Sequence, residues 1–214
     1  MSTAQAKPRK ARKPARAGRP PGSSKEDTLA RILPVARRHF AEKGFAQATF
    51  KEIGAEIGVT HAALYAYFPS KQALYLATFT NTQSLLLPRY LEAIARATTL
   101  RERITGILMA SAEEHDKDSS VTGFLAAVPI EMRRHPELHD ALMSNNNDVL
   151  VALEGIFTEA QAKGEIRSDI AAADLVSALF GGGVGVALFQ YGLQAPLTDS
   201  MKVFVALIEA SLFQ

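Results

Sequence analysis

Residues 49–71 read Thr49-Phe-Lys-Glu-Ile-Gly-Ala-Glu-Ile-Gly-Val-Thr-His-Ala-Ala-Leu-Tyr-Ala-Tyr-Phe-Pro-Ser-Lys71, which predicts two short helices joined by a tight turn. Thr49 and Glu52 form a capping-box pattern that starts the first helix. Gly58 is placed to end that helix, and Thr60 can cap the next one. The apolar residues spaced to face inward are Ile53, Ile57, Val59, Leu64 and Phe68. This layout is typical of a helix-turn-helix unit, whose second helix enters the major groove of DNA.

The rest of the chain also has the apolar spacing of helices, so we predict an all-α protein of about nine helices. Helices are expected to start at Ser23, Thr49, Thr60, Lys71 and Thr99, and then to cover about 120–134, 136–164, 169–191 and 198–213. We expect Gly44 to end the first helix. Three further features should disturb helices: Pro34 by a kink, Pro129 by a bend, and Asn145-Asn146-Asn147 by an interruption.

Charge is distributed unevenly along the 214 residues, although the formal net charge is only +2. Residues 1–25 carry eight basic residues and no acidic one, whereas residues 81–214 carry ten basic and seventeen acidic residues. Because the first segment has too few apolar residues to form a core, we expect residues 1–22 to be a disordered basic arm. A basic arm on an acidic body indicates a polyanionic partner at one end only.

The chain resembles the TetR family of bacterial transcriptional regulators over about residues 28–75. The residues that carry the resemblance are Ile32-Leu33, Phe40, Gly44-Phe45, Thr49, Ile53, Gly58-Val59-Thr60, Leu64-Tyr65, Tyr67-Phe68-Pro69-Ser70-Lys71 and Leu74. The resemblance implies a homodimer with an N-terminal three-helix head that binds an operator and a C-terminal domain that binds a small effector and dimerises. We therefore expect a DNA-binding domain over 23–70 and an effector-binding and dimerisation domain over 71–214.

The residues expected to contact DNA lie at the helix starts of the head and in the arm. They are Thr49, Lys51, Thr60, His61, Ala62, Ala63, Tyr65, Tyr67 and Lys71, with Arg16 and Arg19 of the arm. Both threonines are first of all helix caps, and helix N-termini also attract phosphate. Tyr65 and Tyr67 lie two residues apart and cannot share a face, so one of them should face the core. Alanines can contact only a thymine methyl group, which predicts little direct base readout.

Residues 17–22 resemble part of an AT-hook, a motif that binds the minor groove, but Ala17 stands where the full motif has arginine. A solubilising tail is the alternative interpretation. Within the head, Gly54 and Ile57 depart from the family pattern, which has alanine and a small residue there. We expect Ile57 to fill the space that Gly54 leaves.

The effector and dimer sites are less clearly marked. Candidate pocket residues are Met109, Phe124, Met132, Phe157 and Phe180, each of which could equally be ordinary core. The apolar faces favour an apolar or amphiphilic effector. Candidate dimer-interface residues on the last two helices are Leu179, Gly182, Val186, Phe204 and Ile208. Glycines 181–183 and 185 allow close backbone approach, either to a partner chain or within the chain.

Several classes are not expected. The chain has no cysteine, which excludes disulfides and thiol chemistry, and we find no uncharged apolar stretch long enough to span a membrane. The sequence lacks a phosphate-binding glycine loop, a nucleophile elbow and a dense carboxylate pair, so neither an enzyme nor a cofactor is predicted. His135 and His139 are an unlikely metal pair because His135 precedes Pro136. The favoured function is a cytoplasmic repressor released from a palindromic operator by an effector. The alternative is an architectural, largely non-specific DNA-binding protein that uses the arm.

Overall fold

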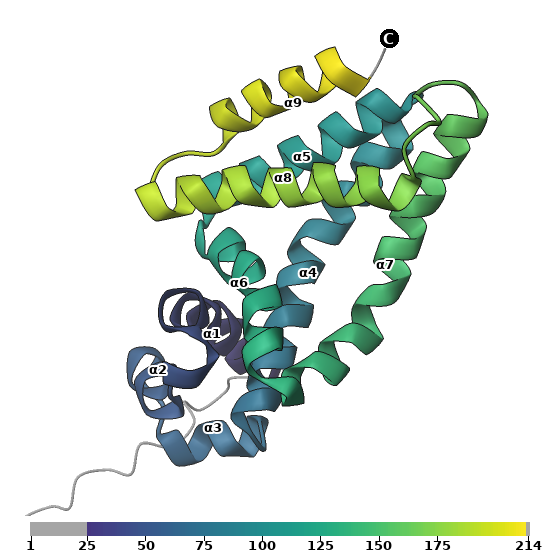
Figure 1. Cartoon of the computed structure of the whole chain (residues 1–214). Coiled ribbons are helices and arrows are strands. Elements are labelled where there is room, and N and C mark those ends of the chain that lie inside the picture. The colour runs from purple at the N-terminus through teal and green to yellow at the C-terminus, as the bar shows by residue number, and fades with distance from the viewer. Residues whose placement is uncertain (1–24, 213–214) are drawn as a thin grey trace, which may run out of the picture.

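The computed structural model describes residues 25–212, and for residues 143–150 and 152 it describes the backbone alone. Over this range the chain forms nine helices and no strand, which confirms the all-α prediction (Figure 1). The helices are α1 (Lys25–Gln47), α2 (Phe50–Ile57), α3 (His61–Tyr67), α4 (Lys71–Arg96), α5 (Leu100–Lys117), α6 (Ser120–Arg134), α7 (Pro136–Ala162), α8 (Ala172–Leu193) and α9 (Thr198–Leu212). Helices α1–α3 lie at one end, α8 and α9 lie at the other, and α4 runs between the two ends (Figure 1). The predicted N-cap Ser23 and the arm lie outside the described residues.

Four helix starts have the predicted side-chain caps. The side-chain oxygens of Thr49, Thr60, Ser70 and Thr99 each accept a hydrogen bond from the backbone N–H three residues later, at 3.1–3.3 Å. The full capping box is present at Thr99 but not at Thr49. At the start of α2, the Glu52 carboxylate accepts hydrogen bonds from the Thr49 hydroxyl and from Lys43, both at 2.8 Å, and not from the Thr49 backbone N–H.

Two predictions about helix continuity and boundaries are wrong. Helix α7 passes through the three asparagines without interruption, because asparagine costs less than about 1 kcal/mol in a helix interior and buried Leu142 and Phe157 hold α7 on both sides. In α1 the only non-helical backbone is at Gly44 (φ 73°, ψ 172°), where the sequence predicts the helix to end, and the dihedral angles at Pro34 are helical. Helix α8 begins at Ala172 rather than at Asp169, whose carboxylate instead accepts from Arg167 at 2.6 Å.

The core consists of two clusters, and the first one crosses the predicted division at residue 70. Four aromatic rings from three helices, Phe40 and Phe45 of α1, Tyr75 of α4 and Phe124 of α6, lie with centroids 4.9–6.3 Å apart. The second cluster joins α5, α7, α8 and α9. The DNA-binding end is therefore packed onto α4 and α6, and the boundaries 23–70 and 71–214 stay a prediction.

Helix α8 corrects the expectation about membrane segments. It is long and apolar enough to cross a membrane by length and composition. In the structure it packs against α6, α7 and α9. Core helices of soluble proteins pass the same test, so the finding by itself is weak evidence for a membrane span.

A buried arginine ties α1 to the α5–α6 connection. Arg37 donates from Nη2 to Asp118 at 2.6 Å and from Nε to the Ser120 hydroxyl at 3.0 Å. Burial opposes ionisation of Asp118, but hydrogen bonds from Ser120 and Arg37 lower the pKa of its carboxyl group. This ion pair links the DNA-binding end to the start of α6.

We predict that Arg37→Met destabilises the protein by about 3 kcal/mol, because it leaves the partly buried Asp118 charge without its partner. The matched control is Arg38→Met, which removes an exposed pair with Glu56 and should cost less than about 1 kcal/mol. Urea unfolding at one fixed protein concentration measures both losses. Equal losses for the two variants would contradict the prediction.

Candidate functional site

The turn between α2 and α3 is fixed by two glycines. Gly58 adopts the left-handed conformation (φ 74°, ψ 27°) that glycine favours. A Cβ on Gly54 would lie 2.9 Å from the Val59 carbonyl oxygen and 3.4 Å from Leu64. The space beside Gly54 is therefore taken by the turn and by α3. The expectation that Ile57 fills this space is wrong, since no Ile57 atom is among the nearest neighbours.

Most of the residues predicted to contact DNA are exposed at this end of the molecule. Six of the nine in the head have exposed side chains, and three are half-buried. The exposed residues are Thr49, Lys51, Thr60, His61, Ala62 and Tyr65, and the half-buried ones are Ala63, Tyr67 and Lys71. Arg16 and Arg19 lie outside the described residues. The head residues thus gather on the starts of α2 and α4 and on α3.

The two tyrosines of α3 face different ways, as their spacing predicts. Tyr65 is 49% exposed, and its ring lies tilted against Phe50, with centroids 4.6 Å apart, and edge-on to His61, with centroids 5.0 Å apart. Tyr67 is half-buried and packs against the first core cluster. Tyr65 is therefore held in place by ring contacts while one side stays open.

Lys71 has a structural partner that the sequence does not reveal. Its Nζ donates to the Ala46 carbonyl oxygen at 2.8 Å and lies 4.8 Å from the centre of the Phe45 ring. Burial lowers the pKa of this amine, partly opposed by the charge of Glu131. Lys71 thus stabilises the end of α1, and a phosphate contact remains a prediction.

Acidic side chains on α2 are paired with basic ones on α1. Glu52 accepts from Lys43 at 2.8 Å, and Glu56 accepts from Arg38 and from His39. The hydrogen bond from Lys43, followed by that from Thr49, lowers the pKa of Glu52 to about 2. These pairs offset negative charge beside the predicted DNA contacts. Sequence spacing could not identify them, because the partners lie 9–18 residues apart on separate helices.

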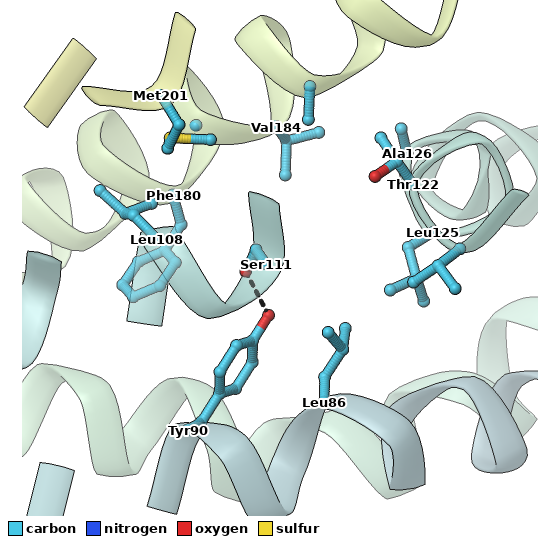
Figure 2. A pocket seen from close by; sticks show the side chains of 13 residues that line it. Leu86, Tyr90, Leu108, Ser111, Thr122, Leu125, Ala126, Phe180, Val184 and Met201 are labelled. Atoms are coloured by element: carbon cyan, nitrogen blue, oxygen red, sulfur yellow. Dashed lines mark hydrogen bonds between the residues drawn. The ribbon is translucent and has the colours of Figure 1, made fainter. Parts of the chain in front are cut away.

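An apolar cavity of about 120 Å³ lies among α4, α5, α6, α8 and α9 (Figure 2). Its lining residues are Leu86, Tyr90, Leu108, Ser111, Val121, Thr122, Leu125, Ala126, Phe180, Gly183, Val184, Ala187 and Met201. Figure 2 shows the Tyr90 side chain extending from α4 toward Ser111, to which its hydroxyl is hydrogen bonded at 2.6 Å. The cavity therefore has apolar walls and one polar corner.

The structure does not bring the five candidate pocket residues together, and only Phe180 lines this cavity. Phe124 and Met132 belong to the first core cluster, and Phe157 belongs to the second. Met109 packs against the second cluster and lines a separate groove between α4 and α5. Tyr90, Ser111 and Thr122 were not among the predicted pocket residues. The sequence feature that could have identified them is a hydroxyl on an otherwise apolar helix face.

The outer face of α8 and α9 is apolar and exposed. Its large residues are Leu188, Phe189 and Leu193 of α8 with Val203 and Leu207 of α9, and Phe189 and Leu207 are 67% and 65% exposed. The predicted interface residues lie elsewhere: Leu179 and Ile208 are buried, and Val186 and Phe204 are half-buried. A Cβ on Gly182 would lie 2.7 Å from the Phe204 ring, so this glycine serves packing within the chain. Gly181 and Gly185 have open space beside them.

Within the described residues no group of three or more potential metal ligands comes together. His135 lies 3.4 Å from Glu131 and 3.5 Å from Glu137, and its ring packs edge-on against Phe45. His139 contacts Asp140 at 3.1 Å. The two histidines therefore have separate partners.

Comparison with known proteins supports the helix-turn-helix head and the all-α fold. A family profile described as bacterial regulatory proteins of the tetR family matches residues 32–78. The HTH-type transcriptional regulator UidR of Escherichia coli K12 is 29% identical over 145 residues, which are 68% of this chain and 72% of UidR. The structure of Salmonella enterica GusR is 25% identical, with a TM-score of 0.68, over 89% of this chain and 98% of GusR.

A third similar structure, that of Bacillus subtilis FadR in complex with stearoyl-CoA, is 22% identical with a TM-score of 0.70, over 84% of this chain and 96% of FadR. At this identity the likeness concerns the fold. Together with the exposed α2–α3 unit, the family match and UidR identify the protein's class. The chain is a DNA-binding transcriptional regulator whose residues 32–78 match the tetR family model.

Proposed function

We propose that this protein is a homodimeric repressor that binds a palindromic operator through α2 and α3 and is released by a small molecule bound in the apolar cavity. The observation that carries the proposal is the exposed surface of a TetR-family head packed on helices that themselves line a cavity. UidR and GusR, which resemble the chain over most of its length, support a regulatory role. FadR, which has a similar fold and whose structure holds stearoyl-CoA, supports a small-molecule ligand.

In the proposed complex, some residues would contact DNA phosphates and position the protein, and others would contact base edges and recognise the sequence. The N-termini of α2 and α3, with Thr49 and Thr60 as caps, favour phosphate contacts, and Lys51 adds an exposed positive charge. His61 and Ala62 at the exposed start of α3 can reach base edges, but only His61 can form hydrogen bonds there. Because this readout is sparse, we propose that the basic arm and the shape of the DNA contribute to recognition.

The dimer would form through the outer face of α8 and α9. This face presents five large exposed apolar residues, including Phe189 and Leu207. Exposed apolar patches on soluble proteins mark interaction sites. The two-fold symmetry of such a dimer matches the symmetry of a palindromic operator.

Effector binding would act on DNA through α4. This helix begins at Lys71 beside the DNA-binding end and lines the cavity with Leu86 and Tyr90. A ligand that displaces α4 would change the separation of the two heads. Half-sites lie roughly 34–36 Å apart, or a multiple of this, so a small change in separation weakens binding.

Selection of bound sequences from a random pool of DNA duplexes, with the full-length protein at near-physiological salt, tests the proposal. We expect enrichment of a palindrome. Binding without any enrichment would instead support the architectural function, in which the charge of the arm dominates.

We predict that deletion of residues 1–22, which contain seven basic residues, weakens operator binding and flattens its salt dependence. The slope of log K against log salt should fall by roughly 0.9 for each arm residue that contacts a phosphate. Fluorescence anisotropy at several salt concentrations measures the slope. Lys202→Gln on α9, at the opposite end of the molecule, serves as the control and should leave the slope unchanged. Unchanged affinity after the deletion would show that the arm has no part in binding.

We predict that Phe189→Asp converts the dimer to a monomer at micromolar concentration, because it places a charge in the apolar interface. The matched control is Leu91→Asp, which places the same charge at a leucine on α4 that is 57% exposed. Sedimentation velocity distinguishes the two species. A Phe189→Asp variant that remains dimeric would place the interface on another surface.

A further inference from the structure

We infer that the apolar cavity binds a small uncharged molecule, about the size of one aromatic ring, that carries a hydrogen-bond donor such as a hydroxyl or N–H group. The inference rests on the proposed function and specifies the chemistry of its effector. It follows from the volume of the cavity, its lack of charge and the directions of its hydrogen bonds.

The polar corner at Tyr90 can accept a hydrogen bond but has no proton to give. The Ser111 hydroxyl donates to the Ile107 carbonyl oxygen at 3.0 Å, because a carbonyl oxygen can only accept. Ser111 has a single proton, so Tyr90 must be the donor in the 2.6 Å contact between the two hydroxyls. Burial raises the pKa of Tyr90, against the lowering effect of the Ser111 hydrogen bond, and so keeps its proton in place. The remaining lone pairs of the Tyr90 oxygen are free to accept.

The Thr122 hydroxyl, like that of Tyr90, donates its proton to a group within the protein. His115, which is buried, lies with Nε2 3.2 Å from the Ala195 carbonyl oxygen and with Nδ1 2.9 Å from the Thr122 hydroxyl. Since the carbonyl only accepts, a neutral imidazole at this position has its proton on Nε2, and its Nδ1 is then an acceptor. Thr122 therefore donates to His115. All three hydroxyls that line the cavity use their protons within the protein, and they offer only lone pairs to a ligand.

The walls offer no charged partner to a ligand. None of the thirteen lining residues carries an ionisable acid or base other than the Tyr90 phenol. A carboxylate placed there would lose its hydration, would meet no cation, and would face the oxygen lone pairs of Tyr90 and Thr122. A carbonyl group would have no donor to pair with. A hydroxyl or N–H group would find an acceptor, so the lining selects for donors.

The size of the cavity limits the apolar part. Its volume of about 120 Å³ is similar to that of an engineered cavity of about 150 Å³ that binds benzene. A single ring therefore fits, whereas two fused or linked rings exceed this volume.

Four single-ring probes test the inference by calorimetry on the full-length protein at pH 8, where unperturbed histidine is neutral. Phenol supplies a donor, toluene has the same shape without one, benzaldehyde supplies only an acceptor, and benzoate is charged. We expect phenol to bind more tightly than benzaldehyde, and benzoate not to bind. Tighter binding of benzaldehyde or benzoate than of phenol, or no binding of phenol, would overturn the assignment. Tighter binding of 4-phenylphenol than of phenol would overturn the limit on size.

The variant Tyr90→Phe separates hydrogen bonding from hydrophobic transfer. It should weaken phenol binding roughly three- to tenfold, the effect of one net hydrogen bond, and should leave toluene binding unchanged. Tyr75→Phe is the matched control, because the Tyr75 hydroxyl is buried in the first core cluster without a hydrogen-bond partner among the described residues. Equal effects of Tyr90→Phe on phenol and toluene would contradict the role of Tyr90.

Operator binding, measured in the presence and absence of each probe, tests this inference separately from the proposed function. Donor-dependent binding of phenol without any release of DNA would contradict effector control while upholding the ligand class. Specific operator binding by a protein that binds none of the probes would uphold the DNA-binding function and contradict the ligand class.

Discussion

The four packed rings of Phe40, Phe45, Tyr75 and Phe124 connect the DNA-binding end to the rest of the chain. They come from α1, α4 and α6, so these three helices cannot shift independently without loss of close packing. Helices α4 and α6 also line the cavity. In the proposed mechanism, a change of cavity shape would reach α1 through side chains already in contact, and the ion pair between Arg37 and Asp118 adds a second connection.

Polar groups at the other end are arranged around His115. This side chain joins α5 to α6 through Thr122 and to the α8–α9 connection through Ala195. The neighbouring Asp116 accepts from the backbone N–H groups of Leu197 and Thr198 and thereby caps α9. The cavity lining and the outer apolar face are thus parts of one hydrogen-bonded framework. The proposed ligand cavity and the proposed dimer face accordingly lie on the same few helices.

Local sequence correctly predicted the helices and the helix-turn-helix unit of the head. The caps at Thr49, Thr60, Ser70 and Thr99 depend on residues three positions apart, and they formed as expected. Gly54 shows where this guide failed, because its role depends on the Val59 carbonyl across the turn. Lys71 is a second case, since its partner Ala46 lies 25 residues away.

The sequence by itself determined the helical class, the helix-turn-helix unit and the family, because these depend on spacing within one or two helices. The tertiary structure decided which apolar residues became core, cavity wall or outer surface. Phe124, Phe157 and Phe180 are alike in sequence terms, yet only Phe180 lines the cavity. Gly182 packs on Phe204 while Gly181 has open space beside it. The physical reason is that hydrophobic burial is non-directional, so the partner of each apolar face is set by how helices cross and not by their own periodicity.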